Sequence, residues 1–225
     1  MGVKERRTRH HAAMEQRILK TAEELLMRSG PDAVSLRAVA ERIEYSPSAI
    51  YGYFPTKDDL LAALAADGFR QLNDALTRVS EVTNSSPLAR LREFYWRYYE
   101  FGKTHPAYYE LMFLDSSYAQ DRWDREALEL LRPATADADR LIAGCIATGT
   151  FLSEMSPTAV RRTLWAAVHG AAVIALRKRL PAESHRDRLA ADTLDAVLAG
   201  CRAGAAPATR VDVRMTADSI QGSVG

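Results

Sequence analysis

The stretch "SPSAIYGYFPTKDDL", residues 46–60, gathers groups that can touch a nucleic acid. Ser46 and Pro47 are typical of a helix start, since a serine caps well and a proline fits the first turn. The small residues of this helix would let its backbone approach base edges closely; they are Ser46, Ser48, Ala49 and Gly52. The hydroxyls of Tyr51 and Tyr53 can donate to phosphates. Together these residues predict a short helix that enters the major groove of double-stranded DNA.

Lys57 follows this short helix and can be interpreted in two ways. The helix dipole disfavours a cation in a first turn by roughly 0.3–1 kcal/mol. A phosphate docked there would account for the lysine, because the free amides and the ammonium would both point at the anion. The alternative is an exposed lysine that pairs with Asp58 or Asp59.

The other face of the same helix must be anchored. Ile50 and Phe54 lie four residues apart, so they share the inward face. Gly52 costs roughly 1 kcal/mol relative to alanine inside a helix, and close approach of another surface would account for that cost.

A second group of candidate binding residues is the aromatic-rich segment from Phe94 to Phe113. An aromatic helical interior with a few hydroxyls suits an apolar or planar small molecule. Plain core packing is the alternative for any single ring. His169, four residues after Trp165, could bond a ligand or serve as a satisfied core residue.

Several function classes find no support in the sequence. Acid, base and nucleophilic groups do not converge, the five histidines are scattered, and no metal or phosphate-loop motif occurs. We therefore predict no enzyme, no metal and no cofactor. No apolar run approaches the roughly 20 residues of a membrane span, and two distant cysteines fit a reducing cytoplasm. The net charge of +1 says nothing about DNA, but residues 1–11 are basic and form either an arm along phosphates or a disordered tail.

The elements that must position these residues are helical. Apolar residues recur at spacings of three and four, and no segment reads as a strand. We predict an all-α fold of about nine helices, with an N-terminal three-helix head and a C-terminal helical bundle. A long helix should follow Thr56 and reach about residue 82, and Pro133 should break or kink the segment 121–152.

Residues 12–72 closely resemble the DNA-binding domain of TetR-type transcriptional regulators. The resemblance lies in "SLRAVAERI", "SPSAIYGYF" and "TKDDLL". It implies DNA contacts by Ser35, Arg37, Ser46, Ser48, Tyr51, Tyr53 and Lys57. Pro47 and Ala49 replace polar side chains of many relatives, so Arg37 is the best candidate for a bidentate guanine contact. Pro47, Ala49 and Gly52 complete the predicted DNA-binding set.

The resemblance also implies an inducer pocket in the C-terminal part. Its predicted lining is Tyr95, Trp96, Tyr99, Tyr108, Tyr109, Met112, Phe113, Trp123, Trp165 and His169. "WAAVHG" at 165–170 and "FGKTHPAYYELMF" look like the tryptophan-histidine-glycine (WHG) subclass of these regulators. The predicted parts are a basic disordered arm at 1–11, a DNA-binding domain at 12–72 with its motif at about 35–54, a ligand-binding and dimerisation domain at 73–204, and a disordered tail at 205–225.

The function expected from these features is a homodimeric, cytoplasmic repressor that a small apolar or aromatic ligand releases from its operator. The last two helices would form the dimer, because a four-helix bundle of two helices per subunit buries their apolar faces. An activator, or an interaction module with the same fold, is the alternative.

Overall fold

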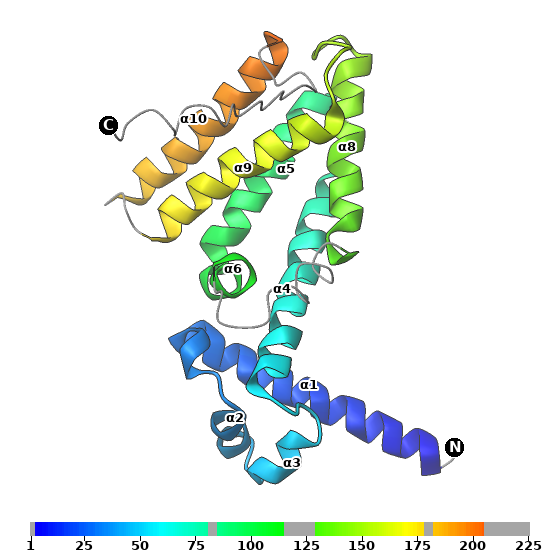
Figure 1. Ribbon diagram of the computed structural model, residues 1–225, viewed down its shortest axis with the longest axis vertical. Helices are drawn as coiled ribbons and strands as arrows, with labels where there is room; N and C mark the ends of the chain where they lie inside the picture. The colour runs from blue at the N-terminus through cyan, green and yellow to red at the C-terminus, as the bar shows by residue number, and fades with distance from the viewer. Residues whose placement is uncertain (1–2, 81–84, 115–128, 178–181, 205–225) are drawn as a thin grey trace, which may run out of the picture.

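The computed structural model describes residues 3–80, 85–114, 129–177 and 182–204. Within these ranges the chain forms nine α-helices and one short 3-10 helix, and no strand (Figure 1). The prediction of an all-α fold with about nine helices is confirmed. The tail predicted to be disordered, 205–225, lies outside the described residues.

The head, at the lower end of Figure 1, contains the first four elements. They are α1 (Val3–Ser29), η1 (Pro31–Ala33), α2 (Leu36–Arg42) and α3 (Pro47–Tyr51). The first helix ends before Gly30-Pro31, where Gly30 adopts a φ of 78° that suits glycine. The prediction of a disordered arm at 1–11 is wrong for residues 3–11, which form the first turns of α1.

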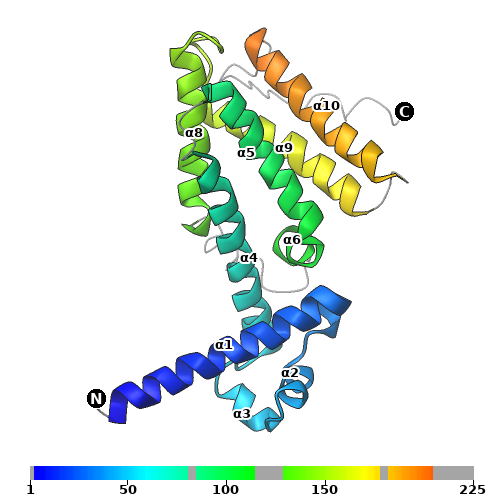
Figure 2. The ribbon, with the colours of Figure 1, turned by 180° about the vertical axis from the view of Figure 1, so that it is seen from behind.

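Helix α4 (Lys57–Ser80) connects the head to the rest of the molecule, which we call the body (Figure 2). All five of its leucines are buried, at Leu60, Leu61, Leu64, Leu72 and Leu76, and two pairs of them, 60 with 64 and 72 with 76, are four residues apart. The same apolar stripe therefore belongs to the core at both ends of the helix.

The body contains five further helices. They are α5 (Pro87–Thr104), α6 (Pro106–Phe113), α8 (Arg132–Ala147), α9 (Pro157–Leu176) and α10 (Glu183–Arg202). Helices α9 and α10 pack side by side against α5, and α8 packs against α4 and α5. Pro133 lies in the first turn of α8, so it marks a helix start as its fixed φ favours. None of the described helices is both long and apolar enough to cross a membrane.

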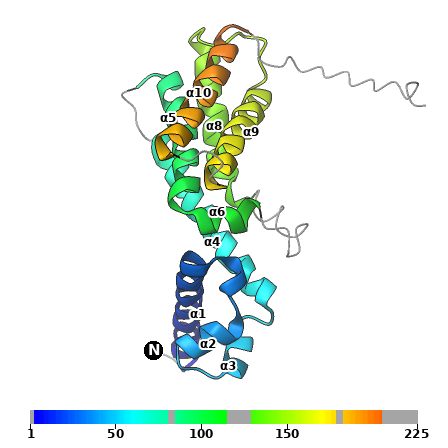
Figure 3. The same ribbon diagram turned by 90° about the vertical axis from the view of Figure 1, so that its left-hand side faces the viewer.

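Helix α6 lies at the end of the body nearest the head (Figure 3) and contacts both α1 and α4. The Tyr108 hydroxyl donates to Asp67 of α4 at 3.1 Å. Gly68 permits the close approach, because a Cβ there would stand only 2.6 Å from the Met112 sulfur and 2.8 Å from the Tyr108 ring. A movement of α6 must therefore displace residues of α4.

Candidate nucleic-acid interface and ligand pocket

Helices α2 and α3 are both capped by serines, and the cap at Ser46 is the one that the sequence predicts. The Ser35 hydroxyl accepts from the Ala38 amide at 3.1 Å. The Ser46 hydroxyl accepts from the Ala49 amide at 3.3 Å and bonds the Ser48 hydroxyl at 3.1 Å. Each cap satisfies an amide that would otherwise lack a partner at the helix start.

A side chain of α1 contacts the turn between α2 and α3. The Arg17 guanidinium donates to the Ile43 carbonyl at 3.2 Å and lies 5.7 Å from the centre of the Tyr45 ring. Glu44 adopts a φ of 60° inside this turn. A left-handed residue other than glycine is strained, so the contact of α1 with the neighbouring carbonyl helps to hold the turn.

The anchor predicted beneath α3 is present. Ile50 is fully buried and Phe54 is 6% exposed, and both belong to the core. Helix α3 is shorter than expected, because it ends at Tyr51. Gly52 lies at the C-cap rather than in the helix interior, with helical φ and ψ. A Cβ at this position would meet its nearest neighbour, the Ala49 carbonyl, at 3.4 Å, so the fold does not itself require glycine there.

Most of the predicted DNA-binding residues lie on the surface of the head. The exposed ones are Arg37, Ser46, Pro47, Ser48, Tyr51, Gly52 and Lys57, and the half-buried ones are Ser35, Ala49 and Tyr53. Tyr51 is 50% exposed, more than any other large apolar side chain described. Helix α3 lies at the end of the molecule farthest from the body (Figure 1), so a long duplex can reach it.

The Tyr53 side chain is packed more closely than the sequence suggested. Its ring lies 4.5 Å from the His11 ring of α1 and packs against the core. The contact orients the ring, so the tyrosine hydroxyl is presented by a fixed side chain. The sequence does not reveal this pair, because the two residues are 42 positions apart.

Lys57 is the first residue of α4 and is exposed. Thr56 and Asp59 form a capping box, in which the Thr56 hydroxyl accepts from the Asp59 amide at 3.1 Å and the Thr56 amide donates to the Asp59 carboxylate at 3.1 Å. Across the described residues Lys57 has no ion pair, so the alternative of pairing with Asp58 or Asp59 is not seen.

Four of the predicted ligand residues are core residues in this structure. Tyr95, Tyr99, Tyr108 and Tyr109 are at most 2% exposed. Their hydroxyls bond the Arg161 carbonyl, Asp187, Asp67 and His169, respectively. Each buried hydroxyl thus has a partner within the chain.

Tyr98, Tyr109, Trp165 and His169 form a hydrogen-bonded group that we call the tyrosine–histidine cluster. The His169 Nδ1 lies 2.6 Å from the Tyr109 hydroxyl and 3.0 Å from the Tyr98 hydroxyl. The Trp165 Nε1 donates to the Tyr98 hydroxyl at 3.2 Å, and its ring stacks on His169. Trp165 is still 45% exposed, so the cluster connects the core to the surface of α9. Tyr98 belongs to the aromatic-rich segment but not to the predicted ligand lining, although it lies three residues from Tyr95.

Burial lowers the pKa of His169, because the charged imidazolium loses its hydration. The unfolded chain then binds protons more readily than the folded one, so stability decreases as the pH falls below the unfolded pKa of about 6.5. We expect the free energy of unfolding in urea to decrease between about pH 7.5 and pH 5.5 by less in His169→Gln than in the wild type. Equal decreases in the two proteins would contradict this assignment.

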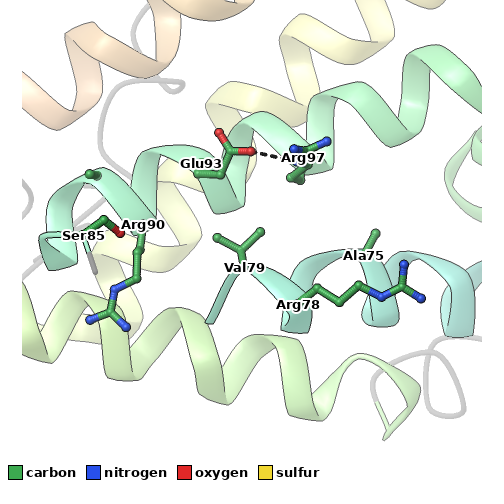
Figure 4. Close-up of a pocket in the computed structure, with 8 residues that line it drawn as sticks. Ala75, Arg78, Val79, Ser85, Arg90, Glu93 and Arg97 are labelled. Atoms are coloured by element: carbon green, nitrogen blue, oxygen red, sulfur yellow. Dashed lines mark hydrogen bonds and ion pairs between the residues drawn. The ribbon is translucent and has the colours of Figure 1, made fainter. Parts of the chain in front are cut away.

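A cavity of about 500 Å³ lies between α4 and α5 (Figure 4). Its lining is Ala75, Arg78, Val79, Ser85, Ala89, Arg90, Glu93 and Arg97. None of the predicted ligand residues belongs to this lining. Trp123 lies outside the described residues, and Trp96, Met112 and Phe113 are half-buried packing residues. A signal for the cavity was present in the sequence, since Arg90, Glu93 and Arg97 are spaced to share one helix face.

The family assignment follows from two profile matches. Residues 18–64, which include α2, α3 and the start of α4, match "Bacterial regulatory proteins, tetR family". Residues 91–212, more than half of the chain, match "Tetracyclin repressor-like, C-terminal domain". The chain belongs to the TetR family. It is thus a transcriptional regulator and not an enzyme, as the sequence predicts.

Named relatives agree with this assignment. This TetR-family chain is similar to the HTH-type transcriptional repressor KstR of Mycobacterium tuberculosis, with 36% identity over 76 residues. The match spans 34% of the chain and 34% of KstR, so it covers about a third of the length of either.

Two solved structures resemble the whole fold. A protein of unknown function from Rhodococcus sp. RHA1 has a TM-score of 0.69 and 25% identity, over 84% of this chain and 95% of that one. A TetR/AcrR-family regulator from Thermobifida fusca has a TM-score of 0.62 and 26% identity, over 85% and 98%.

Proposed function

We propose that the chain is a repressor that binds an operator in double-stranded DNA through α2 and α3. The observation that carries the proposal is the exposed surface at α3. Ser46 and Ser48 give this surface small side chains, and the buried Ile50 anchors the helix to the core. Such a helix can enter the major groove without a clash. KstR, which this chain resembles, is named a transcriptional repressor, and this supports repression rather than activation.

The proposed contacts divide into two kinds. Arg37 is exposed on α2 and can form a bidentate contact with guanine. Tyr51, Tyr53 and Lys57 bind phosphates and set the position of the head on the duplex. Ser35, Ser46, Pro47, Ser48, Ala49 and Gly52 complete the contact surface.

Lys57→Ala should weaken operator binding and make it less salt-dependent. Each lost phosphate contact reduces the slope of log K against log salt concentration by about 0.9, so a dimer should lose about 1.8. Fluorescence anisotropy with a duplex selected from genomic fragments, over a salt series, measures this slope. Arg132→Ala is the control, because Arg132 is an exposed arginine of the body. A wild-type slope in Lys57→Ala would show that the lysine does not contact a phosphate.

We propose a homodimer formed by α9 and α10. Trp165, Ala166 and Ile174 are exposed on α9 and give it an apolar outer surface. Two heads are needed because one recognition helix reads only a few base pairs. Four small or apolar residues of these two helices are buried within the chain and so lie outside the proposed dimer surface, namely Ala171, Ala172, Leu194 and Leu198.

Ile174→Arg should convert the dimer to a monomer, because the substitution places a charge at the centre of an apolar contact. Sedimentation velocity at micromolar protein concentration measures the change in mass. Met27→Arg provides the control, since Met27 is similarly exposed but lies on α1 in the head. If Ile174→Arg sediments as the wild type does, the dimer face lies elsewhere.

We further propose that a small apolar or aromatic effector releases the operator, and that the protein acts in the cytoplasm. The candidate lining remains the predicted aromatic set, with Trp165, His169 and Gly170 supporting assignment to the WHG subclass. Helix α4 would transmit the signal, because it joins the body to the head and α6 packs tightly on it. A ligand can shift such an equilibrium only by its differential affinity for the two states, typically about 1–3 kcal/mol.

A further inference from the structure

The first turns of α1 project beyond the core of the head. Met14 is the first described side chain of the helix that is buried, and every side chain from residue 5 to residue 13 is exposed. At about 1.5 Å per residue, residues 3–13, which we call the α1 extension, lengthen the helix by roughly 16 Å. No described side chain of the extension is buried, so core packing does not account for its helical form.

The α1 extension is basic. Residues 5–11 include three arginines and two histidines against one glutamate. Arg6 and Arg7 are exposed, and neither takes part in an ion pair within the described ranges of the chain. Their guanidinium groups are therefore available to an external anion, and the geometry of paired hydrogen bonds suits them to phosphate.

Arg7 lies on the side of α1 that faces the predicted DNA-binding residues. His11 follows Arg7 by four residues, about one helical turn, so the two share a face. The His11 ring lies 4.5 Å from the ring of Tyr53, two residues after α3. Met14 and Ile18 continue the same line into the core of the head. The face of α1 that covers the core thus becomes an exposed basic face in the extension.

The N-terminal end of α1 also reaches the level of α3. In Figures 1 and 2 both lie at the lower end of the molecule, the end farthest from the body. The extension points away from the side of the body that α9 and α10 occupy. A duplex that joins the two heads of a dimer formed by α9 and α10 therefore continues past α3 in the direction of the extension. The extension then lies beyond the outer edge of each half-site.

We propose that the α1 extension binds phosphates of the duplex just outside each operator half-site, with Arg6 and Arg7 as the contacts. This inference rests on the proposed function, because it adds a second contact surface to the same operator complex. The opposite charges of the extension and the duplex select this partner. Phosphate contacts carry no sequence information, so the flanking base pairs must be present but can have any sequence.

Two lengths of one operator duplex test the proposal. The short duplex ends at the outer edges of the two half-sites, and the long one adds about ten base pairs, one helical turn, of arbitrary sequence on each side. The wild type should bind the long duplex about tenfold more tightly than the short one at low salt, since a dimer gains four exposed arginine contacts. Fluorescence anisotropy of the full chain measures both affinities.

The gain from the added base pairs should disappear in the double variant Arg6→Gln with Arg7→Gln. The slope of log K against log salt concentration on the long duplex should also fall by about 3.6, for two lost contacts in each of two subunits. If this variant still binds the long duplex about tenfold more tightly than the short one, the two arginines do not contact the flanks and the proposal is wrong.

Lys20→Gln with Arg28→Gln is the matched control. Both residues are exposed on α1 but lie outside the extension, and the substitutions remove the same charge from the same helix. This variant should keep the full gain from the added base pairs. The two double variants should bind the short duplex with equal affinities, because they differ only in the position of the lost charge. A loss of the gain in both would assign it to net charge and overturn the proposal.

The short duplex separates this inference from the proposed function. If the wild type binds it and the added base pairs change nothing, the repressor stands, the flanking contact fails, and the basic face belongs to a partner other than DNA. If the wild type binds neither duplex, both proposals fail. Hydroxyl-radical footprints give an independent measurement. Wild-type protection should extend past that of Arg6→Gln with Arg7→Gln by roughly five base pairs at each outer edge, the reach of the extension at about 3.4 Å per base pair.

Discussion

Ile50→Ala is expected to destabilise the head by about 2–5 kcal/mol, the range for truncating a buried isoleucine. Ile50 is fully buried beneath α3 and pairs with Phe54 one turn later. Helix α3 has only five residues, so its own hydrogen bonds cannot hold it in place. Loss of the anchor should therefore also abolish measurable operator binding. Urea unfolding followed by circular dichroism and anisotropy with the selected duplex measure the two effects.

Two further variants make the Ile50 result specific. Ile50→Val removes one methylene and should cost about 0.5–1.5 kcal/mol. Met27→Ala removes an exposed apolar side chain of the same head and should change the stability by less than about 0.5 kcal/mol. An Ile50→Ala protein as stable as the Met27→Ala protein would show that α3 is not held in this way.

Tyr109→Ala is expected to destabilise the body by about 3–5 kcal/mol. The Tyr109 ring is fully buried and lies directly on α5, where a Cβ at Gly102 would stand 3.0 Å from it. Its hydroxyl also bonds His169 at 2.6 Å. Truncation thus removes a large core ring and leaves buried polar groups with fewer partners, so both losses add to the cost.

Tyr109→Phe separates the two contributions. It keeps the ring and removes the hydroxyl, while the Tyr98 hydroxyl still bonds His169 at 3.0 Å. A cost of about 0.5–1.5 kcal/mol is therefore expected for Tyr109→Phe, in the same urea experiment. If Tyr109→Ala were as stable as the wild type, the ring would not be a core residue and would be free to line a ligand site.

The local features of the head could be predicted from the sequence. These features depend only on neighbours within a few residues. They are the helix caps at Ser35 and Ser46, the helix stop at Gly30-Pro31, and the buried pair Ile50 and Phe54. The helical extension of α1 was missed because its charged residues form no apolar face. The packing of Tyr53 on His11 was missed because it joins distant parts of the chain.

The packing of side chains in the body could not be predicted from sequence patterns. Helical spacing predicts that the rings from Phe94 to Phe113 cannot share one face, but it does not say which ring meets a cavity and which meets another helix. Tyr99 and Tyr109 prove to be core residues. The cavity instead depends on the packing of α4 against α5, which brings Arg78 and Arg90 into the lining of one cavity. Such a juxtaposition is set by the tertiary fold.

The most direct test of paired groove binding by α3 is hydroxyl-radical footprinting of the full-length protein on a duplex selected from genomic fragments. We expect two protected half-sites whose centres lie about 34–36 Å apart, or a multiple of that distance, on one side of the duplex. Both should be lost in Ile50→Ala. A protein that stays monomeric and leaves every duplex unprotected at low ionic strength would contradict the account.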